Sequence, residues 1–314
     1  MIEEEIRKIA FDLGIDLIGF FSVESLVECL PYLIKRYEAG LITGFEGGLP
    51  KERINYHHFF QNAKSGIVIG VSSYQKLKKP KDDKKRVELA SVSWGEDYHA
   101  VLFHLMNHLM EKINENLIIQ GKPAVNYKAV VDNSPLVDRG SAYRAGLGFF
   151  GKNNLLISQT LGSYFFIGQI LLDDEIAFRP TQIIPNGCGD CRRCLDACPY
   201  QALGEGYTLD PSRCISFLTQ KKNLSPDEEK RIKTYLYGCD LCQQVCPYNK
   251  DLKKTSESQF WTSPELAYPD IEDILVMTNK AFKERFGKTA AGWRGKKTFV
   301  RNATLIEKNE KKND

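Results

Sequence analysis

Apolar positions in the first half of the chain follow two different periods. Residues 3–13, 23–39 and 98–117 repeat their apolar side chains every three to four positions, which predicts amphipathic helices. Residues 65–74 and 163–173 are continuous apolar runs rich in branched or aromatic side chains, which predicts buried strands. Because helices and strands alternate, we expect a layered domain of α/β or α+β type.

Residues 127–147 contain a further predicted strand and helix. The stretch "YKAVVDNS" is typical of a strand, and we expect this strand to end at Asp132. The stretch "PLVDRGSAYRAGL" has helical periodicity, with Pro135 near its start, a position that proline favours. Residues 76–86 combine a proline with dense charge, so they predict an exposed loop.

The composition changes near residue 178, where prolines and a glycine lead into a cysteine-rich segment. A chain of 314 residues is long enough for more than one domain. We therefore expect an N-terminal domain over residues 1–177, a cysteine-rich domain over 178–250 and a helical segment over 251–314.

Composition excludes several classes of protein. There is no run of about 18 apolar residues, so we expect no membrane-spanning helix. The N-terminus has neither the basic start nor the small-residue cleavage site of a secretory signal. Nine cysteines without such a signal indicate metal or redox chemistry in the cytoplasm and argue against a disulfide framework. The net charge of +3 is too small to indicate a nucleic-acid partner by itself.

Eight of the nine cysteines fall into a repeated pattern. One set matches C-x2-C-x2-C-x3-C-P, which is typical of bacterial ferredoxins. Another has the spacing C-x2-C-x3-C-P, which lacks only the first cysteine, and Cys214 can provide that missing ligand from upstream. Eight thiolates are enough for two [4Fe-4S] clusters. The complete set is Cys188, Cys191, Cys194 and Cys198, and the incomplete one is Cys239, Cys242 and Cys246.

The fourth thiolate of such a run binds the other cluster in two-cluster ferredoxins. Zinc bound by four cysteines is the alternative, but two runs that end in Cys-Pro are not typical of zinc ribbons. Cys29 lies in an apolar stretch, and we expect it in the hydrophobic core. We assign one cluster to Cys188, Cys191, Cys194 and Cys246, and the other to Cys198, Cys214, Cys239 and Cys242.

Iron–sulfur clusters pass single electrons, so the first domain should contain the group that receives them. No G-x-G-x-x-G sequence follows a predicted strand, and no P-loop is present. Nicotinamide binding on a Rossmann fold therefore has no basis in this sequence, and a different electron acceptor is needed.

Long motifs give the chain a specific resemblance. "VVDNSPLVDRGSAYRAGLGFFGKNNLLIS", "GSYFFIGQILLD", "RCISFLT" and "YGCDLCQQVCPYNK" follow one another in the order found in the epoxyqueuosine reductase family. The chain resembles this family from about residue 45 to residue 302. The resemblance implies cobalamin, in its cob(II)alamin form, and two [4Fe-4S] clusters. It also implies an oxidoreductase that reduces epoxyqueuosine to queuosine at the wobble position (34) of tRNA, the last step of queuosine biosynthesis.

The resemblance also implies a fold. We expect an α+β chain with an N-terminal α/β cobalamin-binding domain similar to that of reductive dehalogenases. A bacterial two-cluster ferredoxin-like domain should follow it. The helical C-terminal segment is shorter than in longer relatives, which continue past "VRNATL" into helical repeats.

The chemistry of an epoxide agrees with this assignment. Reductive opening of the ring needs two electrons and a proton for the departing oxygen. The clusters deliver electrons singly, so a two-electron centre must lie between them and the substrate. A nearby carboxylic acid can provide the proton if burial raises its pKa.

The resemblance places site residues on particular positions of this sequence. It implies that Asp132, in the V-D-x-x-P element, is the proton donor and lies at the cobalamin. Asp138 is the competing carboxylate, which we interpret as the partner of Arg139, Arg144 or another cation. Arg53 stands in "KERINY", where relatives have Arg-x-Asp-Pro and this chain has Asn55 and Tyr56. The glycine-rich stretch implies cobalamin contacts, with an ordinary tight turn as its alternative, at Gly151, Lys152, Asn153 and Asn154.

The partners expected from the resemblance are tRNA and an external low-potential electron donor, for a monomer with no membrane contact. Binding of tRNA requires basic surface. Two other functions stay open, a reductive dehalogenase-like corrinoid enzyme and a plain ferredoxin-type electron carrier. The dehalogenases usually have a twin-arginine export signal, which this chain lacks. The basic residues that are candidates for contact with tRNA are residues 76–86, Arg192 with Arg193, Lys221 with Lys222, and Arg294 with Lys296, Lys297 and Arg301.

Overall fold

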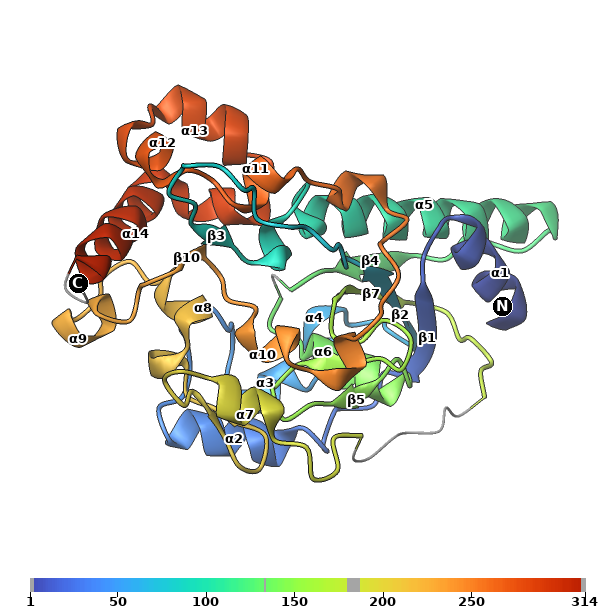
Figure 1. Cartoon of the computed structure of the whole chain (residues 1–314). Coiled ribbons are helices and arrows are strands. Elements are labelled where there is room, and N and C mark those ends of the chain that lie inside the picture. Colours follow the sequence, from blue (N-terminus) through green and yellow to red (C-terminus); the bar gives the residue numbers. More distant parts are fainter. Residues whose placement is uncertain (1–2, 133, 180–186, 312–314) are drawn as a thin grey trace. The chain divides into compact units, whose positions relative to one another are not determined.

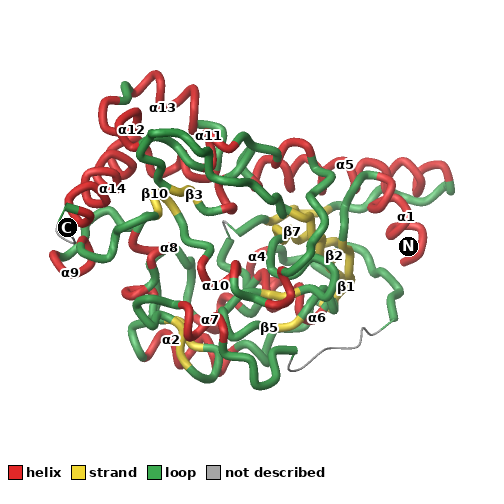
Figure 2. The backbone as a smooth tube through the Cα atoms, in the orientation of Figure 1, coloured by secondary structure: helices red, strands yellow, loops and turns green. Residues whose placement is uncertain are grey.

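The computed structural model divides the chain into two compact units, described separately below (Figures 1 and 2). Unit 1 is formed by Met1–Ser72 and His99–Asp190, and unit 2 by Ser73–Tyr98 and Cys191–Asp314. Residues 73–98 thus belong with the second half of the chain, whereas the sequence placed them in the first domain. The predicted division at residues 177 and 250 stays a prediction. The structure describes residues 3–132, 134–179 and 187–311.

Unit 1 is built on a four-stranded sheet in which every pair of neighbours is antiparallel. The strand β2 lies inside the sheet, and all of its residues are buried. This explains why its sequence is continuously apolar rather than alternating. The strand order is β1 (Leu17–Ser22), β2 (Ser65–Ser72), β7 (Phe165–Leu172) and β4 (Tyr127–Val130).

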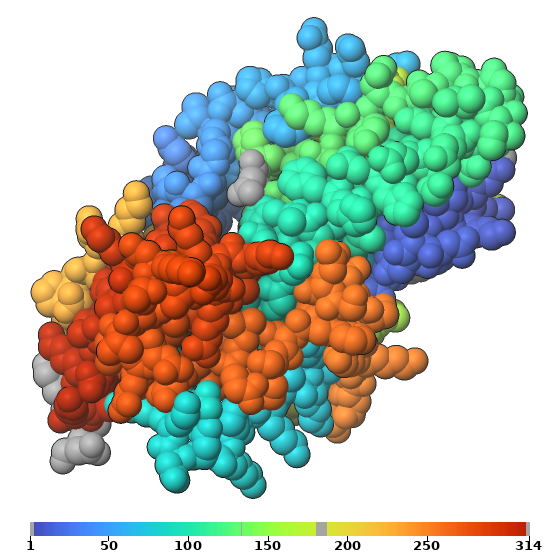
Figure 3. Space-filling view, turned by 90° about the horizontal axis from the view of Figure 1, so that it is seen from above, coloured from blue at the N-terminus to red at the C-terminus, as the bar shows by residue number. Residues whose placement is uncertain are grey.

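Helices and a small hairpin complete unit 1, so the expected α+β chain with a layered first region is confirmed. Figure 3 shows α5 at the surface on one side of this unit. The helices are α1 (Glu3–Asp12), α2 (Leu30–Glu38), α3 (Pro50–Arg53), α4 (Tyr56–Phe59), α5 (Tyr98–Ile119) and α6 (Asp138–Arg144), and the hairpin strands are β5 (Phe149–Phe150) and β6 (Leu156–Ile157).

Two of these helices cover opposite faces of the sheet. Neighbouring residues of a strand point to opposite faces. A side chain at Gly168 would come within 2.9 Å of the Met106 sulfur, so this face of β7 packs against α5. Gln169, the next residue of β7, donates a hydrogen bond to Asp138 at the start of α6. The other face of the sheet therefore meets α6.

Several boundaries differ from the expectation. The helix predicted over residues 23–39 begins only at Leu30, because Pro31 occupies its first turn and lacks an amide proton. Cys29 precedes that helix and is buried, as expected. The strand expected to reach Asp132 ends at Val130, and the following helix begins at Asp138. The edge strand β1 was not predicted.

Unit 2 has little sheet and many short helices. Its core is formed mainly by apolar side chains of the last three helices and of a two-stranded parallel pair, β3 with β10. The strands are β3 (Glu88–Leu89), β8 (Leu203–Gly204), β9 (Thr208–Leu209) and β10 (Tyr235–Tyr237). The α-helices are α7 (Arg193–Ala197), α8 (Ile215–Leu218), α9 (Pro226–Glu229), α10 (Leu241–Gln244), α11 (Pro264–Ala267), α12 (Ile271–Val276), α13 (Asn279–Phe286) and α14 (Gly295–Glu310). The 3-10 turns are η1 (Ser91–Ser93), η2 (Pro211–Arg213), η3 (Pro247–Asn249), η4 (Ser258–Phe260) and η5 (Ala290–Arg294).

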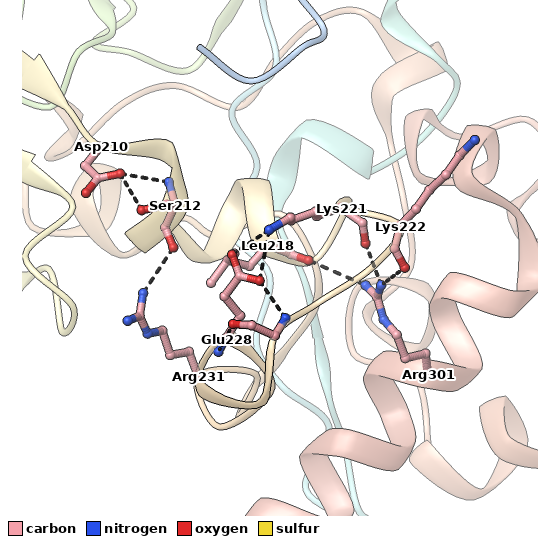
Figure 4. A network of polar contacts seen from close by, with 9 residues as sticks. Asp210, Ser212, Leu218, Lys221, Lys222, Glu228, Arg231 and Arg301 are labelled. Carbon is pink, nitrogen blue, oxygen red and sulfur yellow. Dashed lines mark hydrogen bonds and ion pairs between the residues drawn. The ribbon is translucent and has the colours of Figure 1, made fainter. Parts of the chain in front are cut away.

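Polar side chains of α14 hold the cysteine-rich segment of unit 2 in place. The Asn302 side chain is fully buried and donates to the backbone oxygens of Thr219 and Leu236, both at 2.8 Å. The Arg301 guanidinium donates to the oxygens of Lys221 and Lys222 (Figure 4). Side chains of α14 thus satisfy backbone carbonyl groups of the cysteine-rich segment.

We predict that Asn302→Ala lowers the free energy of unfolding by about 2–4 kcal/mol, because two buried carbonyl groups lose their donor. Thr304→Ala is the matched control, since the Thr304 hydroxyl only bonds Val300 of its own helix. Urea unfolding followed by circular dichroism measures both. Equal midpoints for the two variants would contradict the role of Asn302.

Candidate active site and cysteine sites

Asp132 lies just beyond the end of β4, in an unusual backbone conformation. Its φ is +49°, in the left-handed region that residues other than glycine seldom adopt. Its side chain is 64% exposed, and Oδ2 lies 3.9 Å from Nε2 of His99. Strained conformations of this kind cluster at functional sites. An exposed carboxyl beside an imidazole is therefore available to a large substrate.

Asp138 is the second carboxyl of this region and is more enclosed than Asp132. Its Oδ1 accepts a hydrogen bond from Nε2 of Gln169. Burial raises the pKa of Asp138 to about 7, and the negative charge of Asp132 adds to the effect. Of the cations expected near Asp138, Arg139 and Arg53 act on its charge, whereas Arg144 binds Glu28 at 2.8 Å.

Two arginines lie close to these carboxyls. Arg53 donates from Nε to the Pro135 oxygen at 3.1 Å, and Arg139 donates to Asn154. Burial lowers the pKa of both arginines, and the charge of Asp138 opposes that shift in each. An arginine remains charged at neutral pH even so. The region therefore combines two acids with two fixed cations.

The departure of "KERINY" from the Arg-x-Asp-Pro element leaves the local turn intact. The Asn55 side chain accepts a hydrogen bond from the amide of His57 and so caps the short helix α4. Asparagine and aspartate are both good residues at this position. In this chain, Asn55 thus forms the helix cap that follows Arg53.

The glycine-rich stretch forms the turn between β5 and β6, in agreement with the tight-turn alternative. Gly151 donates its amide to the Leu155 oxygen at 2.8 Å, and Asn154 has a φ of +65°. A side chain at Gly151 would come within 2.4 Å of Ile157. Asn153 is buried, and its Nδ2 has no hydrogen-bond partner among the described residues. That orphan donor fits an acceptor from a bound molecule.

Lys152 contacts the start of the cysteine-rich segment, and its predicted contact with cobalamin stays a prediction. Its amide donates to Sγ of Cys188 at 3.4 Å, and its Nζ donates to the oxygen of Gly189 at 2.8 Å. The structure therefore joins this lysine to the first cysteine of the ferredoxin-like run. Contact with cobalamin was the role inferred from the resemblance.

The eight patterned cysteines are partly buried and none is in a disulfide. Backbone amides approach several of their sulfurs. Ala202 donates to Cys198 at 3.3 Å, Ser216 and Phe217 donate to Cys214, and Leu241 donates to Cys239. Such bonds are a means by which proteins set the potential of iron–sulfur clusters. The donor set fits [4Fe-4S] clusters.

Several of these thiols in unit 2 lie close enough to interact electrostatically. Burial raises the pKa of Cys239 to about 12, and the charges of Cys214 and Cys198 contribute. Burial also raises the pKa of Cys242 well above its usual value, with contributions from Cys239 and Cys214. A bound cationic group would stabilise the thiolate forms of these cysteines. Among the described residues, no three His, Cys, Asp or Glu side chains are arranged so that they could hold a single metal ion.

Some of the basic candidates have structural partners. Lys221 binds Glu228 through Nζ at 2.7 Å, and Arg301 binds backbone carbonyl groups (Figure 4). Arg192 pairs with Glu205. The loop over residues 76–86 is largely exposed, as predicted, and protrudes from unit 2 in Figure 3. Among the helices that the structure describes, none has the length and apolarity needed to cross a membrane.

Two family models match the chain. Residues 53–133 match "Epoxyqueuosine reductase QueG, DUF1730", and residues 187–249 match "4Fe-4S double cluster binding domain". The second match contains all eight patterned cysteines and favours iron–sulfur clusters over zinc.

Relatives resemble nearly the whole chain. The epoxyqueuosine reductase of Lactococcus garvieae is 40% identical over 96% of this chain and 85% of the relative. The structure of the enzyme from Streptococcus thermophilus has a TM-score of 0.89 and 39% identity, over 98% of this chain and 81% of that one. An epoxyqueuosine reductase bound to a stem loop of epoxyqueuosine-modified tRNA-Tyr has a TM-score of 0.89 and 36% identity, with the same coverage.

We predict that Asp138→Asn changes how stability depends on pH. Aspartate in an unfolded chain titrates near pH ~3.9. The folded carboxyl keeps its proton to about pH 7, so the free energy of unfolding falls as the pH rises through this window. The substitution removes that loss and should stabilise the protein by about 1–3 kcal/mol above the window but not below it. Urea unfolding of wild type and variant, at one pH below this window and one above it, measures their difference in free energy of unfolding. A difference that does not change with pH would contradict the raised pKa.

Proposed function

The chain belongs to the epoxyqueuosine reductase family, and on this premise we propose that it reduces epoxyqueuosine to queuosine at the wobble position (34) of tRNA, the last step of queuosine biosynthesis. The observation that carries the proposal is the position of Asp132. It presents an exposed carboxyl from a left-handed backbone, beside His99 and close to Asp138. An acid at this exposed position can protonate the departing oxygen of a substrate that is too large for the protein to enclose.

The proposed cofactors are cobalamin and two [4Fe-4S] clusters, with the cysteine ligands that the sequence pattern assigns. Bound cobalamin would provide the two-electron reduction that single-electron clusters cannot perform alone. The residues that would hold it are Arg53, Asp132, Gly151, Lys152, Asn153 and Asn154. The unsatisfied amide of Asn153 supports this role, because the amide side arms of a corrin offer carbonyl acceptors.

Within this proposal, side chains of the protein donate and restore the proton that the reaction consumes. Asp132 gives its proton to the departing oxygen. The imidazole of His99, 3.9 Å from that carboxyl, is placed to restore the proton afterwards. Arg53 and Arg139 limit the repulsion between Asp132 and Asp138. The two carboxyls can therefore lie close together.

The wider setting follows from the substrate. We propose that the protein acts as a monomer in the cytoplasm, where tRNA is modified, and makes no membrane contact. The clusters must be reduced by an external low-potential donor. The similarity of the first unit to the cobalamin domain of reductive dehalogenases stays a prediction.

Asp132→Ala should retain iron and cobalamin but lower turnover by about 100-fold or more, since it removes the general acid. The assay uses protein reconstituted with iron, sulfide and cobalamin, a low-potential reductant and RNA that contains epoxyqueuosine. Asp227→Ala is the control, because Asp227 lies on the surface of α9 and accepts a hydrogen bond from Lys230 at the end of that helix. Unchanged turnover in Asp132→Ala would remove this residue from its role. No reaction by cofactor-loaded wild type would refute the function.

Cys214→Ala should lower the iron content from about eight to about four atoms per chain, because one four-iron cluster loses a ligand. Cys29→Ala is the matched control, since Cys29 lies in the core of unit 1 outside both cysteine runs. Iron and acid-labile sulfide analysis of the reconstituted proteins measures the loss. Equal iron in both variants would exclude Cys214 as a ligand.

A further inference from the structure

The segment Gly187–Gly189 contacts the hairpin of β5 and β6 at three points. A side chain at Gly187 would come within 2.2 Å of the Phe149 ring, so the segment runs directly over that buried ring. The Lys152 amide donates to Sγ of Cys188 at 3.4 Å. The Lys152 ammonium donates to the oxygen of Gly189 at 2.8 Å. Lys152 thus bonds both the sulfur of Cys188 and the backbone oxygen of the residue that follows it.

These contacts have an electrostatic consequence for a cluster bound by Cys188. A reduced cluster carries one more negative charge than an oxidised one. An amide proton aimed at the ligand sulfur and a nearby ammonium both stabilise the additional charge. The bond between the Lys152 ammonium and the Gly189 oxygen is exposed, so solvent and salt weaken the effect of this charge without removing it.

We propose that Lys152 is a positioning residue for the iron–sulfur cluster that Cys188 ligates, and that its charge raises the reduction potential of that cluster. The inference rests on the proposed function in one respect, since it assumes that Cys188 ligates a cluster. It gives Lys152 a role in the electron path in addition to the corrin contact that the family resemblance implies. The turn that the sequence associates with cobalamin thereby also controls the first cysteine of the cluster-binding run.

The test compares Lys152→Met and Lys152→Arg with wild type after reconstitution with iron and sulfide. Redox titration followed by electron paramagnetic resonance gives the midpoint of each cluster. At the wild-type midpoint, Lys152→Met should lower the ratio of reduced to oxidised form about three- to tenfold for one cluster only. A tenfold change corresponds to about 59 mV for a one-electron couple. Lys152→Arg keeps the charge and should stay within about twofold.

Lys122→Met is the control for removal of a positive charge, since Lys122 bonds the exposed Gln120. Loss of about four irons in Lys152→Met, with full iron in Lys152→Arg, would also support the positioning role. Full iron with both midpoints unchanged in Lys152→Met would overturn the proposal, as would an equal shift of both clusters. These measurements need neither RNA nor cobalamin, so failure to reduce epoxyqueuosine would leave them interpretable.

Discussion

The hydrogen bonds that hold the turn Gly151–Leu155 connect the centre of the sheet to the first cysteine. On one side, Arg139 donates to Asn154. Next to it, Asp138 accepts from Gln169, a fully buried residue of β7. On the other side, Lys152 binds Cys188 and the residue after it. A shift of this turn would therefore move the acid region and the cysteine together.

Charge is the second constraint on this part of unit 1. Asp132 and Asp138 repel each other, and burial adds to the cost of ionising Asp138. Arg53 and Arg139 offset that cost, while both have further partners that fix their positions. A protonated carboxyl can thus persist near neutral pH at Asp138. Acid catalysis is helped by a raised pKa, which we expected at the proton donor Asp132 and which the structure shows at Asp138.

Much of the fold could be predicted because the signals are local. The apolar runs gave β2 and β7, and the cysteine spacing gave the cluster-binding segment. The strand β1 was missed because its apolar run in "LIGFFS" is short. The inclusion of residues 73–98 in unit 2 depends on β3 pairing with β10, a contact between segments far apart in the sequence. Periodicity cannot reveal such a contact.

The candidate site was predictable in its residue types but less so in its contacts. Gln169 is the one hydrogen-bonding side chain in β7, and a lone amide in an apolar strand was the available signal that it binds a buried group. Lys152 gave no such signal, because its partner Cys188 lies thirty-six residues away. Arg301 resembled a tRNA-binding cation until its carbonyl partners were known.

The central claim is that this chain reduces epoxyqueuosine in tRNA. The most direct measurement is mass spectrometry of tRNA nucleosides from a bacterial strain that lacks its own epoxyqueuosine reductase and expresses this protein. The account predicts that epoxyqueuosine disappears and queuosine takes its place when cobalamin is available. Persistent epoxyqueuosine, in cells that contain the iron-loaded protein and cobalamin, would contradict it.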